Sequence, residues 1–186
     1  DVLATLKELK VPATFFVLGS SADQNPEMVT KEAASGNEVS SHNQIHNAMD
    51  TVSAATLEKQ MTQSLTTLRK LTGAQPLFLR PPYGSRNKRV DQAIGAHQMV
   101  IALWDVDTED WKYSSKDPAT AQAAILANVT KEVGNGSIIL MHDIHGTSVA
   151  GAGQIVDGLR DRGFTLVTVT DLIGSPRPGE TYFSQP

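Results

Sequence analysis

The sequence contains no cysteine, no excess of basic residues and no long apolar run. Without cysteine, the chain can form neither a disulfide framework nor a thiolate zinc site. No apolar run approaches the length of a membrane-spanning helix. The net charge of −4 and the scattered lysines and arginines argue against a nucleic-acid-binding surface.

The residues that are present are typical of one globular domain. A chain of 186 residues is long enough for one sizeable core and short for two, and its 40% hydrophobic content is ordinary. We therefore expect one domain over residues 1–174, followed by a tail over residues 175–186. The chain starts at Asp1 with neither an initiating Met nor a signal peptide, which we interpret as a processed or trimmed end.

Strand-like and helix-like patterns alternate along the chain. Continuous apolar runs and one short segment before Ser41 predict buried strands. These strands cover residues 13–18, 77–79, 100–104, 137–141 and 164–169. The clearest amphipathic helix covers residues 57–71 and ends at Gly73. Repeated strand–helix units with continuous apolar strands predict an α/β fold, with a parallel sheet and helices outside it.

Polar residues follow the carboxyl end of several expected strands. They are His42, Arg80, Asp107, Asp110 and His142. In a parallel α/β barrel this face holds the active site. We therefore look for chemistry among these residues.

His42 and His46 stand four residues apart with a turn between them. At this spacing two imidazoles can bind one cation, which is half of a typical catalytic metal site. The simpler interpretation is a structural turn with solvated imidazoles, because a lone His-x-x-x-His is common by chance. Other ligands must decide between the two.

The segment from Arg80 to Gly84, Arg-Pro-Pro-Tyr-Gly, must be a loop, because paired prolines cannot sit in a central strand. It could merely close a surface loop. The two prolines, however, fix the backbone and would present the Tyr83 main-chain N–H in a defined direction. That arrangement suits an oxyanion donor.

His142 lies just past a buried strand and has lost part of its solvation, so it needs a polar partner. Asp110, on the neighbouring loop, is a candidate. Such a pair makes a general acid, because the carboxylate orients the ring and stabilises its protonated form.

Other polar residues have simpler interpretations. Asp107, Asp110 and Trp111 could form a solvated acidic turn, and for Asp107 we favour that interpretation, as a cap for a loop. His97 and His145 are interpreted as structural or surface residues.

Together these residues resemble the polysaccharide deacetylases of carbohydrate esterase family four. The family's motifs occur in order over nearly the whole chain, at residues 13–19, 42–46, 80–84, 107–111 and 140–142. The resemblance implies a distorted (β/α) barrel whose first strand is missing from this chain. It also implies that residues 1–174 form an N-terminally incomplete catalytic domain.

The resemblance implies a divalent metal bound by His42 and His46. The metal is usually zinc in this family, although cobalt, nickel or manganese can serve. Tyr83 would offer its backbone N–H to the oxyanion, and Arg80 would hold the catalytic base in place. The metal would activate the water that attacks the acetyl group.

The resemblance also assigns the remaining motif residues. His142 would be the catalytic acid, and Asp110 would tune it. Trp111 and Leu140 would wall a small apolar pocket for the acetyl methyl group. The substrate would be an N- or O-acetylated polysaccharide or oligosaccharide, such as chitin, peptidoglycan or acetylxylan.

Two departures from the family pattern matter. Asn43 stands where the family has Ser or Thr, which we expect to alter a loop contact only. The family's first motif, Thr-Phe-Asp-Asp-Gly, supplies the general base and the third metal ligand, and it would fall just upstream of Asp1. Nothing in their spacing favours Asp50 or Asp143 as substitutes.

Three functions are compatible with the sequence, and we favour the first, because Arg80 would otherwise lack its partner. The first is a secreted or cell-wall deacetylase, monomeric, without a membrane span or a nucleic-acid partner, whose N-terminal fragment was cleaved or left out. In that case the isolated chain would be weakly active or inactive. The second is a polysaccharide-binding remnant that hydrolyses nothing. The third is a cyclic-amide hydrolase of the same superfamily.

Overall fold

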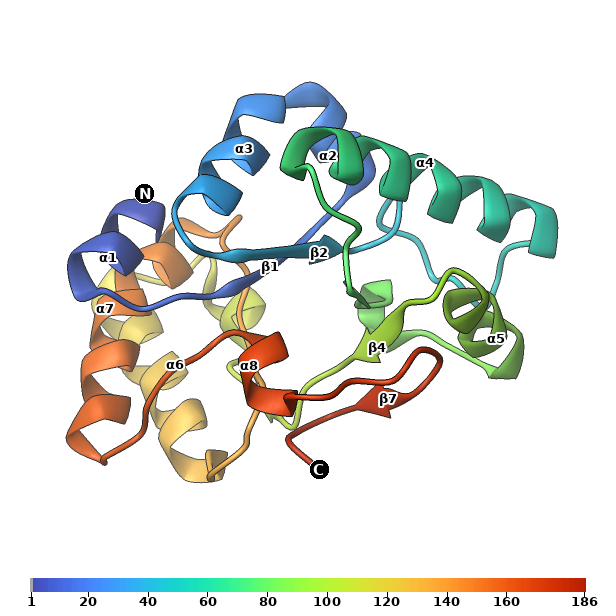
Figure 1. The fold of residues 1–186 in the computed structure, drawn as a ribbon. Coiled ribbons are helices and arrows are strands. Elements are labelled where there is room, and N and C mark those ends of the chain that lie inside the picture. The colour runs from blue at the N-terminus through green and yellow to red at the C-terminus, as the bar shows by residue number, and fades with distance from the viewer. Residues whose placement is uncertain (1) are drawn as a thin grey trace. The chain divides into compact units, whose positions relative to one another are not determined.

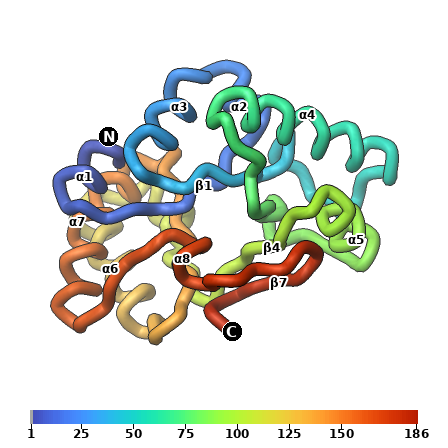
Figure 2. Tube along the Cα trace, viewed as in Figure 1, coloured from blue at the N-terminus to red at the C-terminus, as the bar shows by residue number. Residues whose placement is uncertain are grey.

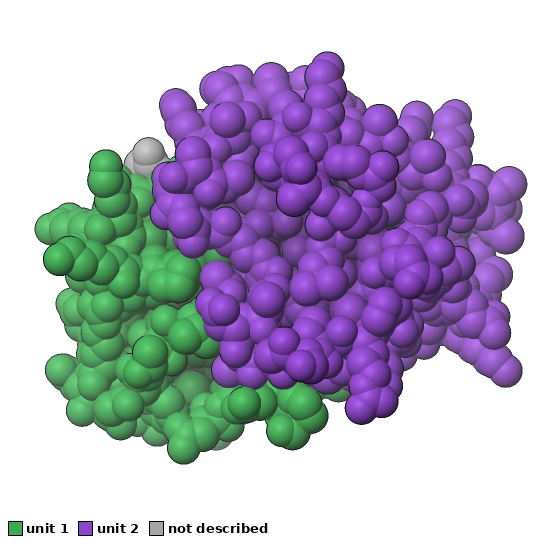
Figure 3. Space-filling view, in the orientation of Figure 1, with its two compact units in different colours: residues 1–13, 104–167, 183–186 green, residues 14–103, 168–182 purple. Residues whose placement is uncertain are grey.

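The computed structural model describes residues 2–186, and their contacts divide the chain into two compact units (Figure 3). Unit 1 contains residues 1–13, 104–167 and 183–186, and unit 2 contains residues 14–103 and 168–182. Each unit has its own parallel sheet and its own helices. No helix within residues 2–186 is long and apolar enough to cross a membrane.

Unit 2 is built on a five-stranded parallel sheet of order β1-β2-β3-β4-β7. The strands are β1 (Thr14–Val17), β2 (Glu38–Ser41), β3 (Phe78–Leu79), β4 (Val100–Ala102) and β7 (Thr181–Tyr182). The central strands β3 and β4 are fully buried, which explains why their sequences are continuously apolar. Because all pairings are parallel, the carboxyl ends of the strands meet at one edge of this sheet.

The helices of unit 2 are α2 (Gly19–Gln24), α3 (Pro26–Ala34), α4 (Ala54–Thr72), α5 (Lys88–Ala96) and α8 (Val169–Ile173). α2, α3 and α4 pack against one another, and α3 and α4 also contact β2 (Figure 1). α4 begins where the Ser53 side chain accepts a hydrogen bond from the Thr56 N–H, and it ends at Gly73 in a left-handed conformation. Its buried face includes Leu57, Met61 and Leu68.

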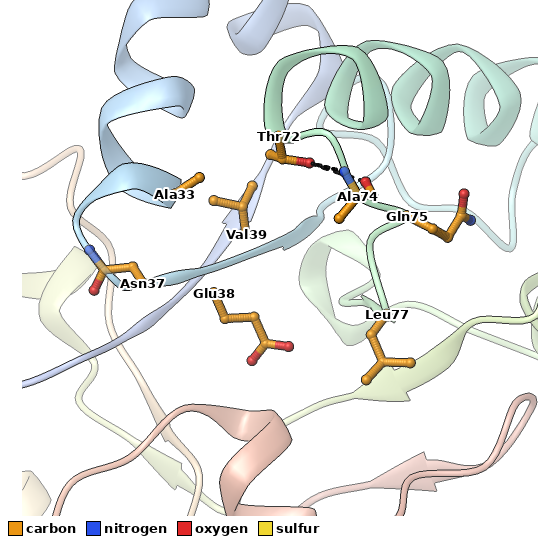
Figure 4. A pocket seen from close by; sticks show the side chains of 8 residues that line it. All are labelled: Ala33, Asn37, Glu38, Val39, Thr72, Ala74, Gln75 and Leu77. Carbon is orange, nitrogen blue, oxygen red and sulfur yellow. Dashed lines mark hydrogen bonds between the residues drawn. The ribbon is translucent and has the colours of Figure 1, made fainter.

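A hollow of about 240 Å³ lies at the amino ends of β2 and β3 (Figure 4). Glu38 is at this edge, and its carboxylate accepts hydrogen bonds from the hydroxyls of Thr14 and Thr170. His42 and Arg80 follow the other ends of the same strands. The hollow therefore takes no part in the polar site described below. Its lining residues are Ala33, Asn37, Glu38, Val39, Thr72, Ala74, Gln75 and Leu77.

Unit 1 contains the parallel pair of β5 (Val106–Asp107) and β6 (Ile139–Leu140). Its helices are α1 (Val2–Leu9), α6 (Pro118–Glu132) and α7 (Gly146–Asp161). α7 packs against both α6 and α1, as the chain trace in Figure 2 also shows. Gly151 and Gly158 let α6 approach closely, because a Cβ at either position would lie 3.3 Å from a side chain of α6. The core between the two helices contains Ile125, Val129, Ile155 and Leu159.

The predicted α/β class with parallel strands is confirmed. The strand expected over residues 164–169 is wrong. Residues 164–168 belong to no strand, and α8 begins at Val169, where the Thr168 side chain accepts a hydrogen bond from the Asp171 N–H. An apolar run becomes a strand only when a neighbouring strand pairs with it, and the part of the chain that is described offers no such pairing.

Two further outcomes concern the predicted C-terminal tail and the predicted bounds of the domain. Within residues 175–186, expected as a tail, β7 pairs with β4 in parallel register. The proposed domain over residues 1–174 stays a prediction.

Candidate functional site

His42 and Arg80 occupy neighbouring positions at the carboxyl edge of the sheet in unit 2. Each follows its strand directly, and Ser41 is in register with Leu79. His42 Nδ1 lies 2.6 Å from the main-chain oxygen of Arg80. A carbonyl oxygen only accepts, so Nδ1 carries the proton and the lone pair of the neutral ring is on Nε2. This is how proteins orient a histidine that binds a metal through Nε2.

The rings of His42 and His46 lie together, with their centroids 5.1 Å apart. Tyr83 approaches the His46 ring edge-on, at a centroid distance of 4.5 Å. The turn between the histidines is held by Asn43, which is fully buried in a left-handed conformation with φ 70°. Its side-chain amide donates to Gln60 Oε1 on α4 over 2.8 Å. The sequence suggested that Asn43 alters a loop contact only. In the structure Asn43 also ties the turn to a helix.

The start of α2 holds the same turn from another direction. The N–H groups of Gly19 and Ser20 donate to the carbonyls of Asn43 and Gln44, both over 2.9 Å. These are N–H groups that a helix leaves unpaired at its first turn. Gly19 has no room for a side chain, because an added Cβ would lie 2.9 Å from the Ser64 Cα. The His42–His46 turn is thus fixed before any ligand binds.

The Arg80 side chain is buried and donates two hydrogen bonds of 3.1 Å, to the carbonyls of Ala102 and Leu103 at the end of β4. Its guanidinium also lies over the Phe16 ring, 3.9 Å from the centroid. Burial lowers the pKa of Arg80 to about 9, which still leaves it protonated at neutral pH. A cation placed at the ends of β1, β3 and β4 can orient a carboxylate there.

Tyr83 has a left-handed backbone conformation, with φ 60° and ψ 9°. Such a conformation is uncommon for a bulky residue and is found preferentially at functional sites. The turn is closed on either side of it, because the N–H groups of Gly84 and Ser85 donate to the carbonyls of Pro81 and Pro82. Within residues 2–186, the Tyr83 N–H donates to no backbone carbonyl. The turn itself therefore does not use this N–H, and its role as an oxyanion donor stays a prediction.

In unit 1, the predicted contact between Asp110 and His142 is confirmed. His142 Nδ1 lies 2.7 Å from Asp110 Oδ1, and the His142 main-chain N–H donates to Oδ2 over 2.7 Å. Asp110 is fully buried, whereas a third of the His142 side chain is exposed. Burial raises the pKa of Asp110, but hydrogen bonds from His142 and Ser148 lower that pKa more, so the net shift is downward.

Other residues complete this end of the β5–β6 pair. Trp111 is half exposed and Leu140 is buried, so an apolar pair lies close in sequence to Asp110 and His142. Asp107 accepts a hydrogen bond from the Glu109 N–H over 2.8 Å, which is the loop cap that we expected. Ser148, on the first turn of α7, donates to Asp110 Oδ2 over 2.6 Å.

No role was predicted for Gly19, Gln60 or Ser148. Gln60 and Ser148 lie on helices and contact Asn43 and Asp110, which are 17 and 38 residues away along the chain. Gly19 contacts Asn43 through its main-chain N–H. No local motif marks such contacts.

The histidine pair fits a divalent metal in part. Two neutral imidazoles suit zinc, cobalt or nickel, and the Nδ1 bond of His42 sets the ring for coordination. Across the described chain, no group of three His, Asp or Glu side chains could hold a metal ion. Asp50 is hydrogen-bonded to the Ser85 hydroxyl and Asp143 is exposed, and among the described residues neither forms such a group with the histidine pair.

Comparison with known proteins places these motifs in a family. Residues 1–102 match the family model described as polysaccharide deacetylase. The chain is 40% identical over 185 residues to peptidoglycan-N-acetylglucosamine deacetylase PgdA of Listeria monocytogenes, covering 99% of this chain and 38% of PgdA. It is 39% identical over 172 residues to peptidoglycan-N-acetylmuramic acid deacetylase PdaC of Bacillus subtilis, covering 92% of this chain and 35% of PdaC.

Solved structures give the same result. The structure of PdaC matches with a TM-score of 0.82 at 37% identity, over 92% of this chain and 80% of that one. A CE4 family pseudoenzyme from Bacillus anthracis matches with a TM-score of 0.85 at 26% identity, over 92% of this chain and 58% of that one. The chain spans little more than a third of the length of the curated relatives PgdA and PdaC.

Proposed function

Because the chain belongs to the polysaccharide deacetylase family, we propose that the whole protein removes acetyl groups from an acetylated polysaccharide by metal-dependent hydrolysis. The observation that carries this proposal is the buried Asp110 carboxylate, whose Oδ1 accepts the Nδ1 proton of the half-buried His142. A solvated acidic turn would not need a fully buried carboxylate with four hydrogen bonds. A general acid needs this arrangement.

In this proposal His42 and His46 hold the metal, with zinc preferred and cobalt, nickel or manganese as substitutes. When bound, the metal supplies Lewis acidity, which polarises the acetyl carbonyl and makes a water molecule more acidic. Since no third ligand joins the pair within the described residues, the proposal takes the third ligand and the base from the remainder of the whole protein. Arg80 orients that base.

Two groups of this chain act on the charge that develops during hydrolysis. The Tyr83 N–H donates to the oxyanion, a contribution of roughly 3 kcal/mol per donor in other hydrolases. His142 in its protonated form gives the Nε2 proton to the leaving nitrogen or oxygen. Asp110 keeps the proton on Nδ1 throughout, so that the ring is oriented by one nitrogen and donates from the other. Trp111 and Leu140 wall the pocket for the acetyl methyl group.

We propose peptidoglycan as the first substrate to test and the cell wall as the location. Both curated relatives are named for peptidoglycan, but for different sugars, N-acetylglucosamine and N-acetylmuramic acid. Their names therefore support the polymer and leave the sugar open. Acetylated chitooligosaccharides and acetylxylan are the comparison substrates.

A second candidate function is polysaccharide binding without hydrolysis. It is favoured by the structural likeness to a CE4 family pseudoenzyme. A binding protein of this kind would hold the polysaccharide without hydrolysing it.

The test measures acetate released by the whole encoded protein from peptidoglycan, acetylated chitooligosaccharides and acetylxylan, with zinc or cobalt added. The proposal predicts release by the wild type and a loss of at least about 100-fold in kcat for His142→Ala. Equal rates would remove His142 from the mechanism. Retention of the protein on insoluble peptidoglycan without any acetate release would support the binding function instead.

A further inference from the structure

Ser148 is a buried polar residue that the proposed reaction does not use. It lies in the first turn of α7 and is 1% exposed. Its hydroxyl donates to Asp110 Oδ2 over 2.6 Å, a short distance typical of a hydrogen bond to a charged oxygen. A buried hydroxyl that made no such bond would cost free energy, so this contact accounts for a serine at a core position.

The four hydrogen bonds to Asp110 come from different parts of unit 1. Oδ1 accepts from His142 Nδ1 and from the Trp111 N–H, and Oδ2 accepts from the His142 N–H and from Ser148. Trp111 is the next residue in the chain, and His142 is the group to be oriented. Ser148 is therefore the one donor of the four that joins the carboxylate to a helix of the core.

We propose that Ser148 is a positioning residue for the His142 acid. Its hydroxyl fixes the Asp110 carboxylate so that Oδ1 faces His142 Nδ1, and the ring is then held with Nε2 directed away from the carboxylate. This role rests on the proposed function only in calling His142 an acid. The geometric part concerns Ser148, Asp110 and His142 alone.

The electrostatic surroundings make the role measurable. His142 is the titratable group whose charge acts on Asp110, and the side-chain hydrogen bond from Ser148 is one of the causes that lower the pKa of Asp110. At the 3₁₀ turn η2 (Asp110–Tyr113), the N-cap residue Glu109 pairs with Lys112. Loss of the Ser148 hydroxyl must therefore raise the pKa of Asp110, because one lowering cause is removed and burial remains.

Thr147 offers a matched control. It is buried in the same turn of α7, and its hydroxyl has no hydrogen-bond partner within residues 2–186. Thr147→Val therefore deletes a hydroxyl next to Ser148 without touching Asp110. Ser148→Thr keeps the hydroxyl and tests rescue.

The experiment is an NMR titration of the Asp110 carboxyl carbon in the wild type, Ser148→Ala, Ser148→Thr and Thr147→Val. We expect a higher Asp110 pKa in Ser148→Ala and wild-type behaviour in Thr147→Val and Ser148→Thr. An unchanged Asp110 pKa in a folded Ser148→Ala protein would overturn the proposal. If Ser148→Ala does not fold, Ser148→Cys, which keeps a weaker donor, must show an Asp110 pKa above that of the wild type, and an unchanged pKa would overturn the proposal.

A second arm measures acetate release by the whole encoded protein. Ser148→Ala should lower kcat about tenfold with KM unchanged, since the substrate does not contact Ser148. A rise in KM at constant kcat would contradict a role through His142. If the wild type releases no acetate, the proposed function fails, and the titration still decides the positioning role by itself.

Discussion

His42 Nδ1 donates to the main-chain oxygen of Arg80 over 2.6 Å, so the first of the two histidines is oriented by the backbone of the neighbouring strand end. The bond depends on the parallel register of β2 and β3 and not on the Arg80 side chain. That side chain points to other partners, the carbonyls of Ala102 and Leu103. One residue therefore serves the site twice, and the two contributions can be separated by mutation.

Removal of either imidazole should abolish metal binding. With His42→Ala or His46→Ala, one of the two proposed nitrogen ligands is lost, and we expect the zinc or cobalt affinity of the whole protein to fall at least about 100-fold. Competition with a chromophoric chelator measures this. His97→Ala is the control, because His97 pairs with Glu58 and lies outside the site. Equal losses in all three variants would mean that the pair is not the metal site.

Arg80→Lys should destabilise the protein by about 2 kcal/mol, because lysine cannot donate to both carbonyls and cover the Phe16 ring at once. The backbone oxygen that holds His42 is unchanged, so metal affinity should fall less than in His42→Ala. Urea unfolding gives the free energy. The exposed Arg69→Lys should change it by less than about 0.5 kcal/mol. If Arg80→Lys left the free energy of unfolding unchanged, this explanation of the Arg80 side chain would be wrong.

Asp110→Asn should change how stability depends on pH. Because the pKa of Asp110 is lowered in the folded protein, its ionised form stabilises the fold fully above the ordinary pKa, and this is lost as pH falls through the lowered value. Relative to the wild type, we expect the free energy of unfolding of Asp110→Asn to be lower by about 2 kcal/mol at pH 7 and by less in acid. Denaturant unfolding from pH 7 down to pH 3 measures the difference.

The control for that series is Asp157→Asn, an exposed carboxylate on α7. It should follow the wild type at every pH. A stability difference between Asp110→Asn and the wild type that stays constant with pH would show that Asp110 contributes by packing and not by charge.

Gly19→Ala should disturb the histidine turn, since an added Cβ would press on the Ser64 backbone and on Gln44. We expect the free energy of unfolding to fall by about 1–3 kcal/mol and metal binding to weaken. Gly153→Ala is the matched comparison, because a Cβ there meets Thr5 and Leu9 only at ordinary distances of 3.8 and 4.0 Å. It lies inside α7 and should stabilise the protein by about 0.5–1 kcal/mol. Thermal unfolding with and without zinc separates the two effects.

The sequence predicts the placement of the polar residues because strand ends in a parallel sheet share an edge. Apolar runs located β3 and β6, and the short segment before Ser41 located β2. In the structure His42 and Arg80 follow neighbouring strands of one sheet, and His142 follows β6 of the other sheet. The partner of His142 was also predictable, because a histidine past a buried strand requires a polar group nearby. These inferences need only the local period and the direction of the strands.

The remainder depends on contacts that no local pattern encodes. The run over residues 164–169 reads as a strand, yet Thr168 caps a helix there. Gln60 is one polar residue on an amphipathic helix, and its contact with Asn43 depends on how α4 lies against the turn. The left-handed Tyr83 is likewise set by the two prolines together with the closing hydrogen bonds, and proline alone does not dictate it.

The central claim is that the His42–His46 pair belongs to a metal-dependent deacetylase. Its most direct test is the rate of acetate release from acetylated peptidoglycan by the whole encoded protein, before chelation, after chelation, and after zinc is restored. For the wild type we predict release that stops on chelation and returns when zinc is restored. For His42→Ala we predict no release at any of the three stages. Acetate release that is insensitive to chelation, or that His42→Ala retains, would contradict it.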